Sequence, residues 1–532
     1  MVDAREYHER TDYSPERLRE MDFELDESNR PRPYKIYEDL PRVSPGDDPD
    51  PPQTPALAAV AADGPAPPAA APAPDGDPDI GTLCHYAAGV TKELEIRGQP
   101  MRFRAAACTG KLYHVDIYAV AGDCGAFSPG VYHFDPHSGE FDVLREGDYR
   151  GALAAAAGER PGENGDGDDG PERTESAGVA DAPVTFVAAS EWWRNAWKYR
   201  DRTYRHAFWD SGTILANLLA VAHGGGHRAE VVAGFADDPV VELLGLDPDE
   251  EAPLALVPVG SGSPVPDDAD ADGATPDVDP IDPDERPLSE NPVDYPLIPD
   301  AWRQSRLDDG AAAASWRANF TVEAADASLG ERVDDADWVA LDPVDAETAS
   351  ARPIGNTIER RGSCREYSRD PITARKFATV LDRALRGVPA DAFAGDLRGL
   401  VDCYCLVHAV EGIESGCYEY HPGPDELERV GDTDRDRAGE LALGQDVVGD
   451  AAVNVYLVAD VDAVVSEFGN RGYRLAQLEA GVALGRLYLA TYAHRSLGGR
   501  GFTFADTEVR EYLSPHADGA TPMTLFAFGT PA

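Results

Sequence analysis

The stretch RDRTYRHAFWDSG, residues 200–212, is repeated as GNRGYRLAQLEAG at residues 469–481, which lie 269 positions further along the chain. With this single shift, residues 184–260 align with residues 453–529 without a gap. Chance similarity does not preserve both order and spacing over that length. The sequence therefore predicts an internal duplication, in which one fold is used twice.

A second shift, of 286 positions, extends the repeat toward the N-terminus. It places VDIYAV at 115–120 on VDCYCL at 401–406, and GVYHFDP on GCYEYHP. We assign the two copies to residues 80–260 and 350–532. Two copies of one fold in one chain are expected to pair as an intramolecular pseudo-dimer.

Strands and helices are mixed within each copy. KLYHVDIYAVAG at 111–122 has the pattern of a strand, and GVYHFDPHSGEFDVL at 130–144 is typical of a hairpin with its turn at Ser138 and Gly139. SGTILANLLAVAHG at 211–224 has apolar residues at helical spacing and stops at glycine. The predicted fold class is α+β.

The chain is strongly acidic. Its 532 residues carry 97 Asp and Glu against 47 Lys and Arg, which gives a formal net charge of −50. At molar salt the Debye length falls to about 3 Å and screens the repulsion within such a chain, so we infer a halophilic, archaeal source. The same charge argues against nucleic acid and anionic membrane lipid as partners. Lysine is rare, and its positions are Lys35, Lys92, Lys111, Lys198 and Lys376.

No apolar run of 18 residues occurs, and the first 20 residues are rich in charge, so we expect a cytoplasmic protein. Seven cysteines without CxxC spacing indicate reduced thiols, with Cys403 and Cys405 in a core strand. His133 and His137 flank the hairpin turn, and no metal site is expected there.

Three segments have the composition of disordered linkers: 43–79, 157–181 and 261–299. They are rich in Pro, Ala, Gly and acidic residues, which bury too little apolar surface to offset the entropy of ordering. Residues 1–42 are then an N-terminal extension, and residues 300–349 connect the acidic linker to the second copy.

Four motifs carry a family resemblance. They are YHERTDY…NRPRPYKIY…LPRV in residues 7–43, RFRAAACTGKLYHVDIYAV at 102–120, WKYRDRTYR…DSG at 197–212 and IERRGSCREYSRDPI at 358–372. Together they resemble the nitroreductase superfamily of flavoproteins, and specifically its SagB/ThcOx-type branch of FMN-dependent azoline dehydrogenases. This resemblance implies two nitroreductase-like α/β/α domains in tandem, with FMN bound across their interface.

Arg361, Ser363 and Arg365 form the Arg-x-Ser-x-Arg phosphate motif of that family, and only the second copy has it. They alternate along an extended segment, so two guanidinium groups and a hydroxyl can face one phosphate. The alternative is an ion-pair network with some of the many carboxylates. In the first copy, the Pro/Ala segment occupies the corresponding place.

The loop that resembles the family's flavin loop occurs only in the first copy, at Cys108, Thr109 and Gly110. Its counterpart in the second copy is AGDLRG at 394–399. The resemblance therefore implies one composite FMN site and one vestigial site. Cys108 stands where the family more often has serine, so the backbone amides around Thr109 and Gly110 are expected to serve the ring. Backbone amides near Arg500 and Gly501 are weaker candidates for the same role.

Lys198 and Tyr199 align with Glu467 and Phe468, so only the first copy keeps the pair. In the SagB/ThcOx-type branch an adjacent Lys-Tyr is implicated in catalysis, and the resemblance implies that role here. A lysine acts as a base only when burial or a cationic neighbour lowers its pKa from about 10.4 toward 7 or 8. The alternatives are a solvent-exposed charge or a partner for Asp201, and a core aromatic for Tyr199.

These features predict an FMN-dependent oxidoreductase that dehydrogenates a small-molecule or peptide-derived substrate, azoline-like by resemblance. Two alternatives stay open, an NAD(P)H-dependent nitro- or quinone reductase and a degenerate flavin-fold scaffold in a biosynthetic complex. Arg202, Tyr204 and Arg205 recur in the second copy as Arg471, Tyr473 and Arg474, and we expect these six residues to serve the fold.

Overall fold

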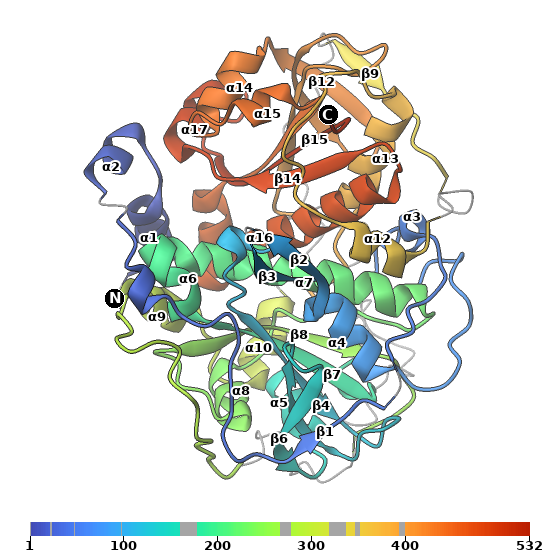
Figure 1. Cartoon of the computed structure of the whole chain (residues 1–532), viewed down its shortest axis with the longest axis vertical. Coiled ribbons are helices and arrows are strands. Elements are labelled where there is room, and N and C mark those ends of the chain that lie inside the picture. The colour runs from blue at the N-terminus through green and yellow to red at the C-terminus, as the bar shows by residue number, and fades with distance from the viewer. Residues whose placement is uncertain are drawn as a thin grey trace.

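The chain forms two antiparallel sheets with a pair of long helices between them (Figure 1). The computed structural model describes residues 2–21, 24–46, 48–96, 98–159, 178–265, 278–318, 337–345, 352–392 and 399–532. Within these ranges, no helix is both long enough and apolar enough to cross a membrane.

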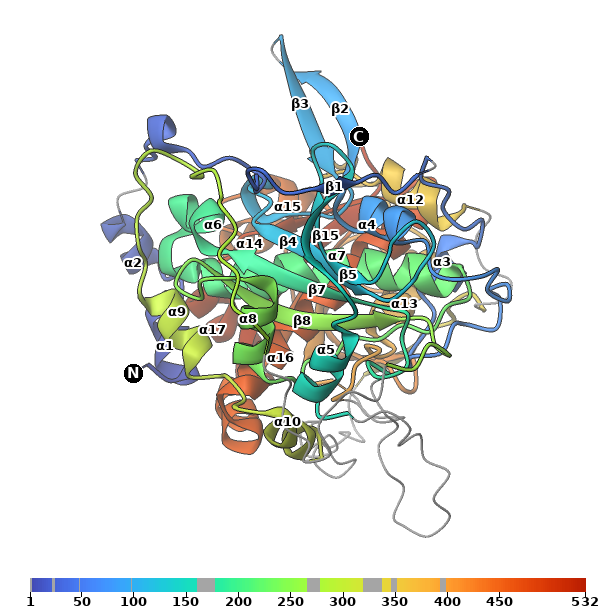
Figure 2. The same cartoon turned by 90° about the horizontal axis from the view of Figure 1, so that it is seen from below.

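The six-stranded sheet belongs to the first copy. Its strands, in spatial order, are β1 (Arg42–Val43), β6 (Glu140–Glu146), β5 (Gly130–Asp135), β4 (Val115–Ala121), β7 (Val184–Glu191) and β8 (Glu251–Val259). The predicted hairpin is confirmed, because β5 pairs with β6 and Gly139 takes a φ of +78° in the turn. β2 (Val90–Ile96) and β3 (Gln99–Arg104) form a separate hairpin that projects from the body in Figure 2.

The seven-stranded sheet belongs to the second copy and has the same topology. Its order is β9 (Trp338–Ala340), β12 (Glu426–Gly431), β11 (Gly416–His421), β10 (Asp402–Val407), β13 (Val453–Ala459), β15 (Thr521–Gly529) and β14 (Gly498–Phe502). The first six strands match the first sheet position by position, and β14 is added at the edge. The duplication read from the sequence is thus confirmed as a repeat of the fold.

Helices cover both sheets. In the first copy they are α1 (Ala4–Thr11), α2 (Pro15–Glu20), α3 (Ala56–Ala59), α4 (Ile80–Ala88), α5 (Arg150–Ala156), α6 (Trp192–Tyr199), α7 (Thr203–Gly224) and α8 (Asp237–Leu244). From there to the C-terminus they are α9 (Leu297–Arg303), α10 (Gly310–Arg317), α12 (Ile354–Arg360), α13 (Ala374–Leu385), α14 (Arg435–Leu441), α15 (Asp446–Asp450), α16 (Val461–Ala493) and α17 (Asp506–Leu513).

The two copies meet along α7 and α16, which lie side by side across the middle of the molecule (Figure 1). At their crossing, Gly212 faces Gly481, its equivalent in the other copy. A Cβ atom on Gly212 would stand 2.3 Å from the carbonyl carbon of Gly481, and one on Gly481 would stand 2.4 Å from the Phe208 oxygen. Only glycine lets the two backbones approach so closely, so the opening stretch of sequence fixes the centre of the pseudo-dimer.

Reciprocal ion pairs stabilise the same interface between the two copies. Arg202 and Arg205 of the first copy pair with Asp506 of the second, with nitrogen–oxygen distances of 2.8 and 3.0 Å. Arg471 and Arg474 of the second copy pair with Asp237 of the first, the equivalent of Asp506. All six side chains are buried. The expectation that these arginines serve the fold is confirmed.

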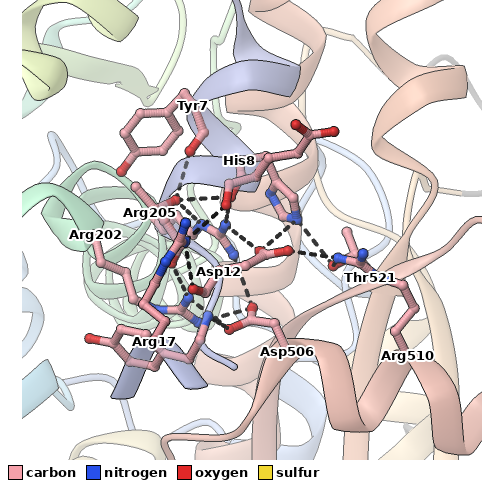
Figure 3. A network of polar contacts seen from close by, with 12 residues as sticks. Tyr7, His8, Asp12, Arg17, Arg202, Arg205, Asp506, Arg510 and Thr521 are labelled. Carbon is pink, nitrogen blue, oxygen red and sulfur yellow. Dashed lines mark hydrogen bonds and ion pairs between the residues drawn. The ribbon is translucent and has the colours of Figure 1, made fainter. Parts of the chain in front are cut away.

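The N-terminal helix α1 completes this network (Figure 3). The carbonyls of His8 and Thr11 accept hydrogen bonds from Arg205 and Arg202, and the Tyr13 amide donates to Asp506 at 2.8 Å. α9 repeats the arrangement for the other half, because the carbonyls of Trp302 and Ser305 accept from Arg474 and Arg471. In the same way, the Leu307 amide donates to Asp237. The repeat therefore includes residues 3–13 and 297–307, which we had assigned to an extension and a linker.

The segment 43–79 was predicted to be a disordered linker, and that prediction is wrong. Residues 56–62 are buried, and α3 packs against both α7 and α16. Pro55 forms a bridge with Pro353, and the Ala56 amide donates to the Arg352 carbonyl at 2.8 Å. The run of alanines is thus explained by packing, because small side chains fit where helices lie close together.

The other linker predictions change as well. Residues 160–177 and 266–277 lie outside the described residues, so the predictions for those parts of 157–181 and 261–299 stay predictions. Elsewhere in 261–299 the prediction of disorder is wrong: Glu285 forms a bridge with Tyr37, and Leu297 and Ile298 are buried in α9. Of residues 300–349, the described ones include most of α9, all of α10 and β9, the edge strand that pairs with β12 of the second copy.

Candidate functional site

The predicted flavin loop of the first copy meets the predicted phosphate motif of the second. Arg361 donates from Nε to the Ala105 carbonyl at 2.8 Å, and from Nη2 to the carbonyls of Arg104 and Ala106 at 2.9 and 3.1 Å. These bonds join the segment that starts at Arg361 to the strand end that leads into Cys108. We call the combined region the composite site; it comprises residues 104–113 and 199 with residues 361–365, 488 and 500–501.

Asp210, in α7, organises the loop. Its carboxylate accepts hydrogen bonds from the backbone amide of Thr109 at 2.9 Å and from the Thr109 hydroxyl at 2.8 Å. Both donors of Thr109 are therefore engaged by Asp210, and the amide that we expected to serve the flavin is not free to do so. His114 also binds Asp210, with Nε2 2.9 Å from Oδ2.

Cys108 contacts the same carboxylate, that of Asp210. Its thiol is 3.1 Å from Asp210 Oδ2, and the Tyr113 amide donates to its sulfur at 3.0 Å. Burial, and then repulsion from Asp210, raise the pKa of Cys108 well above its usual value. A protonated thiol in this position supports the loop and does not act as a nucleophile.

Gly110 and Tyr199 are in contact. Gly110 has a φ of +63°, and a Cβ atom at this position would stand 2.9 Å from the Tyr199 hydroxyl oxygen. Burial raises the pKa of Tyr199 above its usual value, so its hydroxyl is a hydrogen-bond donor. The structure thus brings the flavin loop and the predicted catalytic tyrosine together.

Tyr488, in α16, is the centre of the second copy's contribution. Its hydroxyl accepts a hydrogen bond from the Gly501 amide at 2.7 Å and interacts with the side chain of Ser363. The Arg361 guanidinium lies 5.7 Å from the centre of its ring. Tyr488 therefore connects the phosphate motif to β14, which carries Gly501.

Arg365 and Arg500 lie close to one another. Burial, and then repulsion from Arg365, lower the pKa of Arg500, while Tyr488, Tyr367 and Tyr199 act in the opposite direction. Arg365 and Ser363 are exposed, and Arg500 is partly buried. The structure therefore brings together Arg361, Ser363, Arg365, Arg500 and Gly501 as one group, with Tyr199 of the first copy facing it.

The cations of the composite site have no carboxylate partners. Among the described residues, no ion pair joins an acidic side chain to Arg361, Arg365 or Arg500, although the chain has 97 acidic residues. Lys92 is placed here as well, donating from Nζ to the Arg361 carbonyl. An ion-pair network was the alternative interpretation of the motif, and these contacts do not support it. Uncompensated cations with a hydroxyl and backbone amides form a donor set that fits a phosphate, and the Nη1 group of Arg361 remains for it.

Lys198 lies beside the composite site. Its Nζ is 5.1 Å from the centre of the Tyr199 ring, and the side chain is half-buried. Burial, and then repulsion from Arg30, lower its pKa, while Glu27 acts in the opposite direction. Among the described residues no ion pair joins it to Asp201, which was an alternative role.

Arg200 follows this pair with strained backbone. Its φ is +51° and its ψ is −136°, a region that side-chain-bearing residues rarely adopt. The equivalent residue in the second copy is Gly469, with a φ of +66°. The strain therefore occurs only in the copy that keeps Lys198 and Tyr199, and such strain tends to cluster at functional sites.

The counterpart of the composite site, on the other side of the pseudo-dimer, lacks these groups. Its helix carries Glu479 in place of Asp210, and Glu479 accepts the Leu400 amide at 2.6 Å. Pro55 and Pro353 bridge one another as equivalent residues of the two copies. Counting onward from each of them, the equivalent of Arg361 is Asp63. Residues 393–398, which include most of the counterpart of the flavin loop, lie outside the described residues.

The remaining candidates have structural roles. His223 Nε2 binds the Ala229 carbonyl at the end of α7, and Gly225 caps that helix, as expected. His133 pairs with Asp142, and His137 is in contact with Arg102 on the surface. Cys403 and Cys405 are buried in β10, as predicted.

Two residues of the composite site were missed from the sequence. Tyr488 lies in the apolar run LGRLYLATYA, which reads as core, and Asp210 was quoted only as part of the repeat. A signal was present for Tyr488 alone: its equivalent in the first copy is Leu219, and a polar residue in one copy opposite an apolar residue in the other marks a difference in role, whereas Asp210 is matched by the acidic Glu479.

Sequence comparison gives the class of protein, a nitroreductase-family oxidoreductase. The nitroreductase family model matches residues 136–261. A nitroreductase-family protein of Methanocaldococcus jannaschii is 30% identical over 172 residues, which cover 30% of this chain and 83% of that protein. The chain belongs to the nitroreductase family.

One solved structure shares the fold over the whole length of the chain. A chain from Anabaena variabilis, assigned as a nitroreductase, superposes with a TM-score of 0.72 at 21% identity and covers 100% of both chains. A shorter chain from Ralstonia eutropha, with the same assignment, covers 38% of this chain and 93% of its own length, with a TM-score of 0.31 and 21% identity. The first likeness extends over both copies and shows the fold alone.

Proposed function

We propose that this protein is an FMN-dependent dehydrogenase that binds one FMN per chain at the composite site. The observation that carries this proposal is the group of cations around Tyr488 without acidic partners, at the junction of the two copies. Family membership supports a flavin-dependent oxidoreductase, and the motifs in the N-terminal region and at Lys198 support the SagB/ThcOx-type branch.

The second copy holds the phosphate end of the cofactor. Among the described residues no carboxylate pairs with Arg365 or Arg500, and the two lie near enough to repel one another, so a dianion between them relieves that repulsion. The Ser363 hydroxyl and the Nη1 group of Arg361 supply further donors on the same side. Tyr488 holds Gly501 and Ser363 in place and acts as a positioning residue.

The first copy forms the wall of the reaction site. Asp210 fixes the shape of the loop from Cys108 to Gly110, and Tyr199 closes against Gly110. The bound flavin supplies the hydride acceptor for oxidation of the substrate. Carbon–hydrogen dehydrogenation also releases a proton, so a base is required next to the substrate.

Lys198 is the proposed base. Its pKa is lowered by burial and by Arg30, which increases the fraction of neutral amine at neutral pH. Arginine does not deprotonate in proteins, which explains why a chain with few lysines keeps one here. The substrate class remains as the resemblance implies, a small-molecule or peptide-derived heterocycle of the azoline type.

The test uses the full chain, purified in molar KCl. It is expected to carry close to one FMN per chain and to be bleached anaerobically by a model thiazoline peptide. Lys198→Arg should keep the FMN and lose turnover, because the cation remains and the base does not. The matched control, Lys376→Arg, changes a partly buried lysine that bonds Ser496, and it should leave turnover unchanged.

Three outcomes contradict the proposal. A chain that binds no added FMN would favour the scaffold alternative. Bleaching by NADPH with no response to the peptide would favour the nitro- or quinone reductase. Full turnover of Lys198→Arg would remove Lys198 from the mechanism while leaving FMN binding to stand.

A further inference from the structure

A second cluster of ionisable side chains lies away from the composite site, on the sheet of the second copy. Glu419 and His421 project from β11 and Glu428 projects from β12, and their ligand atoms all lie within 4.8 Å of one another. His516, which follows α17, reaches the same place. Its Nδ1 is 3.3 Å from Glu419 Oε2, and its Nε2 is 3.5 Å from Glu428 Oε1.

We propose that Glu419, His421, Glu428 and His516 bind one divalent transition-metal cation of the Zn²⁺ type. Two imidazoles and two carboxylates form a donor set that such ions use in proteins. Donor atoms at about 2.1 Å from a tetrahedral ion lie about 3.4 Å apart. His421 Nε2 and Glu428 Oε2 are 3.4 Å apart, and His516 Nε2 and Glu428 Oε1 are 3.5 Å apart.

The strand register gives independent support. Glu419 lies directly opposite Glu428 across β11 and β12, and like charges in that position are destabilising. The equivalent pair in the first copy is His133 and Asp142, also directly opposite and in contact at 3.1 Å. The second copy has thus replaced a compatible pair with two carboxylates, and a cation between them removes the repulsion.

In the first copy, arginines pair with the acidic side chains at the position on the sheet that corresponds to the Glu419–Glu428 pair. The second copy lacks these arginines. Arg42 pairs with Asp135 and Asp142, and Arg194 pairs with Asp116. The edge-strand position equivalent to Arg42 holds Trp338, and the helix position equivalent to Arg194 in α6 holds Ala463 in α16. In the part of the chain that the structure describes, no arginine or lysine pairs with Glu419 or Glu428.

The two carboxylates are also largely removed from water. The side chains of Glu419 and Glu428 are 12% and 7% exposed. Burying charged groups without compensation is costly, and a bound divalent cation supplies the compensation that the chain does not.

Tyr404 orients one of the ligands. Its hydroxyl oxygen is 3.1 Å from Nδ1 of His516 and 3.4 Å from Oε2 of Glu419. Because it holds one ring nitrogen, it presents the other, Nε2, toward Glu428. Metal-binding histidines are commonly held in this way through the nitrogen that does not bind the ion. The His516 side chain is 30% exposed, which leaves an entry path for the ion.

The test is a titration of the untagged, chelator-treated chain with Co²⁺ alone, in molar KCl with excess Mg²⁺. The salt and the Mg²⁺ suppress loose binding to a surface with a net charge of −50. We expect one Co²⁺ per chain, a visible absorption band of four-coordinate Co²⁺, and displacement by Zn²⁺. None of these signals depends on FMN, so a failure of the proposed function leaves this test intact.

His421→Ala and His516→Ala are each expected to weaken Co²⁺ binding more than tenfold and to abolish the band. Glu428→Gln keeps the side-chain shape and should weaken binding as well, with circular dichroism confirming that the chain is folded. His137→Ala is the matched control, because His137 lies at the equivalent hairpin turn of the first copy. Absence of the band in the unaltered chain, or unchanged binding in both histidine variants, would overturn the proposal.

Discussion

The composite site and its counterpart across the pseudo-dimer are built on the same pair of helices, yet their polar residues differ. The composite site has Arg361 and Tyr488, where the counterpart has Asp63 and Leu219. The interface between them is unchanged, because each copy keeps its two arginines and the aspartate that receives the other pair. Both copies have therefore kept the residues that hold the interface together. Only one of the two sites has kept the residues of the predicted flavin site.

The largest expected effect is on this shared interface. Asp506→Asn leaves Arg202 buried without a carboxylate and leaves Arg205 with Asp12 alone, and Asp237→Asn removes the carboxylate that Arg471 and Arg474 share. Breaking a buried pair from one side costs about 3–5 kcal/mol of unfolding free energy. Denaturant unfolding should show similar losses for the two variants. A loss confined to one variant would show that the interface is not functionally symmetric.

The next effect separates the two sites. Asp210→Asn should reduce FMN affinity about a hundredfold, because the carboxylate no longer accepts from both Thr109 donors and from His114; hydrogen bonds to a charged acceptor are worth about 1.5–3 kcal/mol each. FMN fluorescence titration measures this loss. Equal FMN affinity in Asp210→Asn and the unaltered chain would exclude the loop from the cofactor site.

Glu479→Gln is the control for Asp210→Asn, and it should leave FMN affinity unchanged. Burial raises the pKa of Glu479 to about 8, above its value in the unfolded chain, so its contribution to stability is present at low pH and is lost as the pH rises toward 8. The Gln variant should therefore match the unaltered chain at pH 5 and be the more stable of the two at pH 8. Thermal unfolding at the two pH values measures the difference.

Arg365 gives a smaller effect on the cofactor alone. Arg365→Ala removes one exposed cation from the phosphate motif and should weaken FMN binding about tenfold, the order of one charge-assisted hydrogen bond. Stability should not change, because the side chain is exposed. Arg369→Ala is the matched control, since Arg369 is exposed and paired with Asp450. Equal FMN affinities of the two variants would place the phosphate elsewhere.

The smallest effect concerns the strained residue. Arg200→Gly should stabilise the fold by about 1 kcal/mol, because glycine adopts a positive φ without steric cost. Gly469→Ala, at the equivalent position, should destabilise the fold. If the strain orients Lys198 and Tyr199, the Arg200→Gly variant will also lose turnover. Calorimetry measures the change in stability, and a turnover assay measures the change in activity. An Arg200→Gly variant with a lower free energy of unfolding than the unaltered chain would contradict the conclusion that the Arg200 backbone is strained.

Much of the fold was visible in the sequence because the core strands and central helices kept matching residues. The repeat at α1 and α9 was not visible, since AREYHERTDY and IPDAWRQSRL share no identical position. Its contacts to the arginines are made by backbone carbonyls, so the side chains were free to diverge. Composition misled us at residues 56–62, where alanine marks close helix packing and not disorder.

The composite site was predictable in its residues and not in its bonding. Spacing identified Arg361, Ser363 and Arg365. It did not show that the backbone carbonyls of residues 104–106 accept most of the hydrogen bonds that Arg361 donates. The motif at Cys108 was recognisable, but the engagement of Thr109 by Asp210 depends on a helix 100 residues away in sequence. Long-range contacts of this kind leave no local pattern.

The position of α1 has a consequence for how the molecule is made. Tyr13 bonds Asp506, and His8 bonds Thr521, across 493 and 513 positions of the chain. α1 can therefore make these contacts only after residues 506–521 have been made, and contacts of such sequence separation form slowly. Before that, the strands of the first copy can pair with one another, while α7 still lacks its packing against α16.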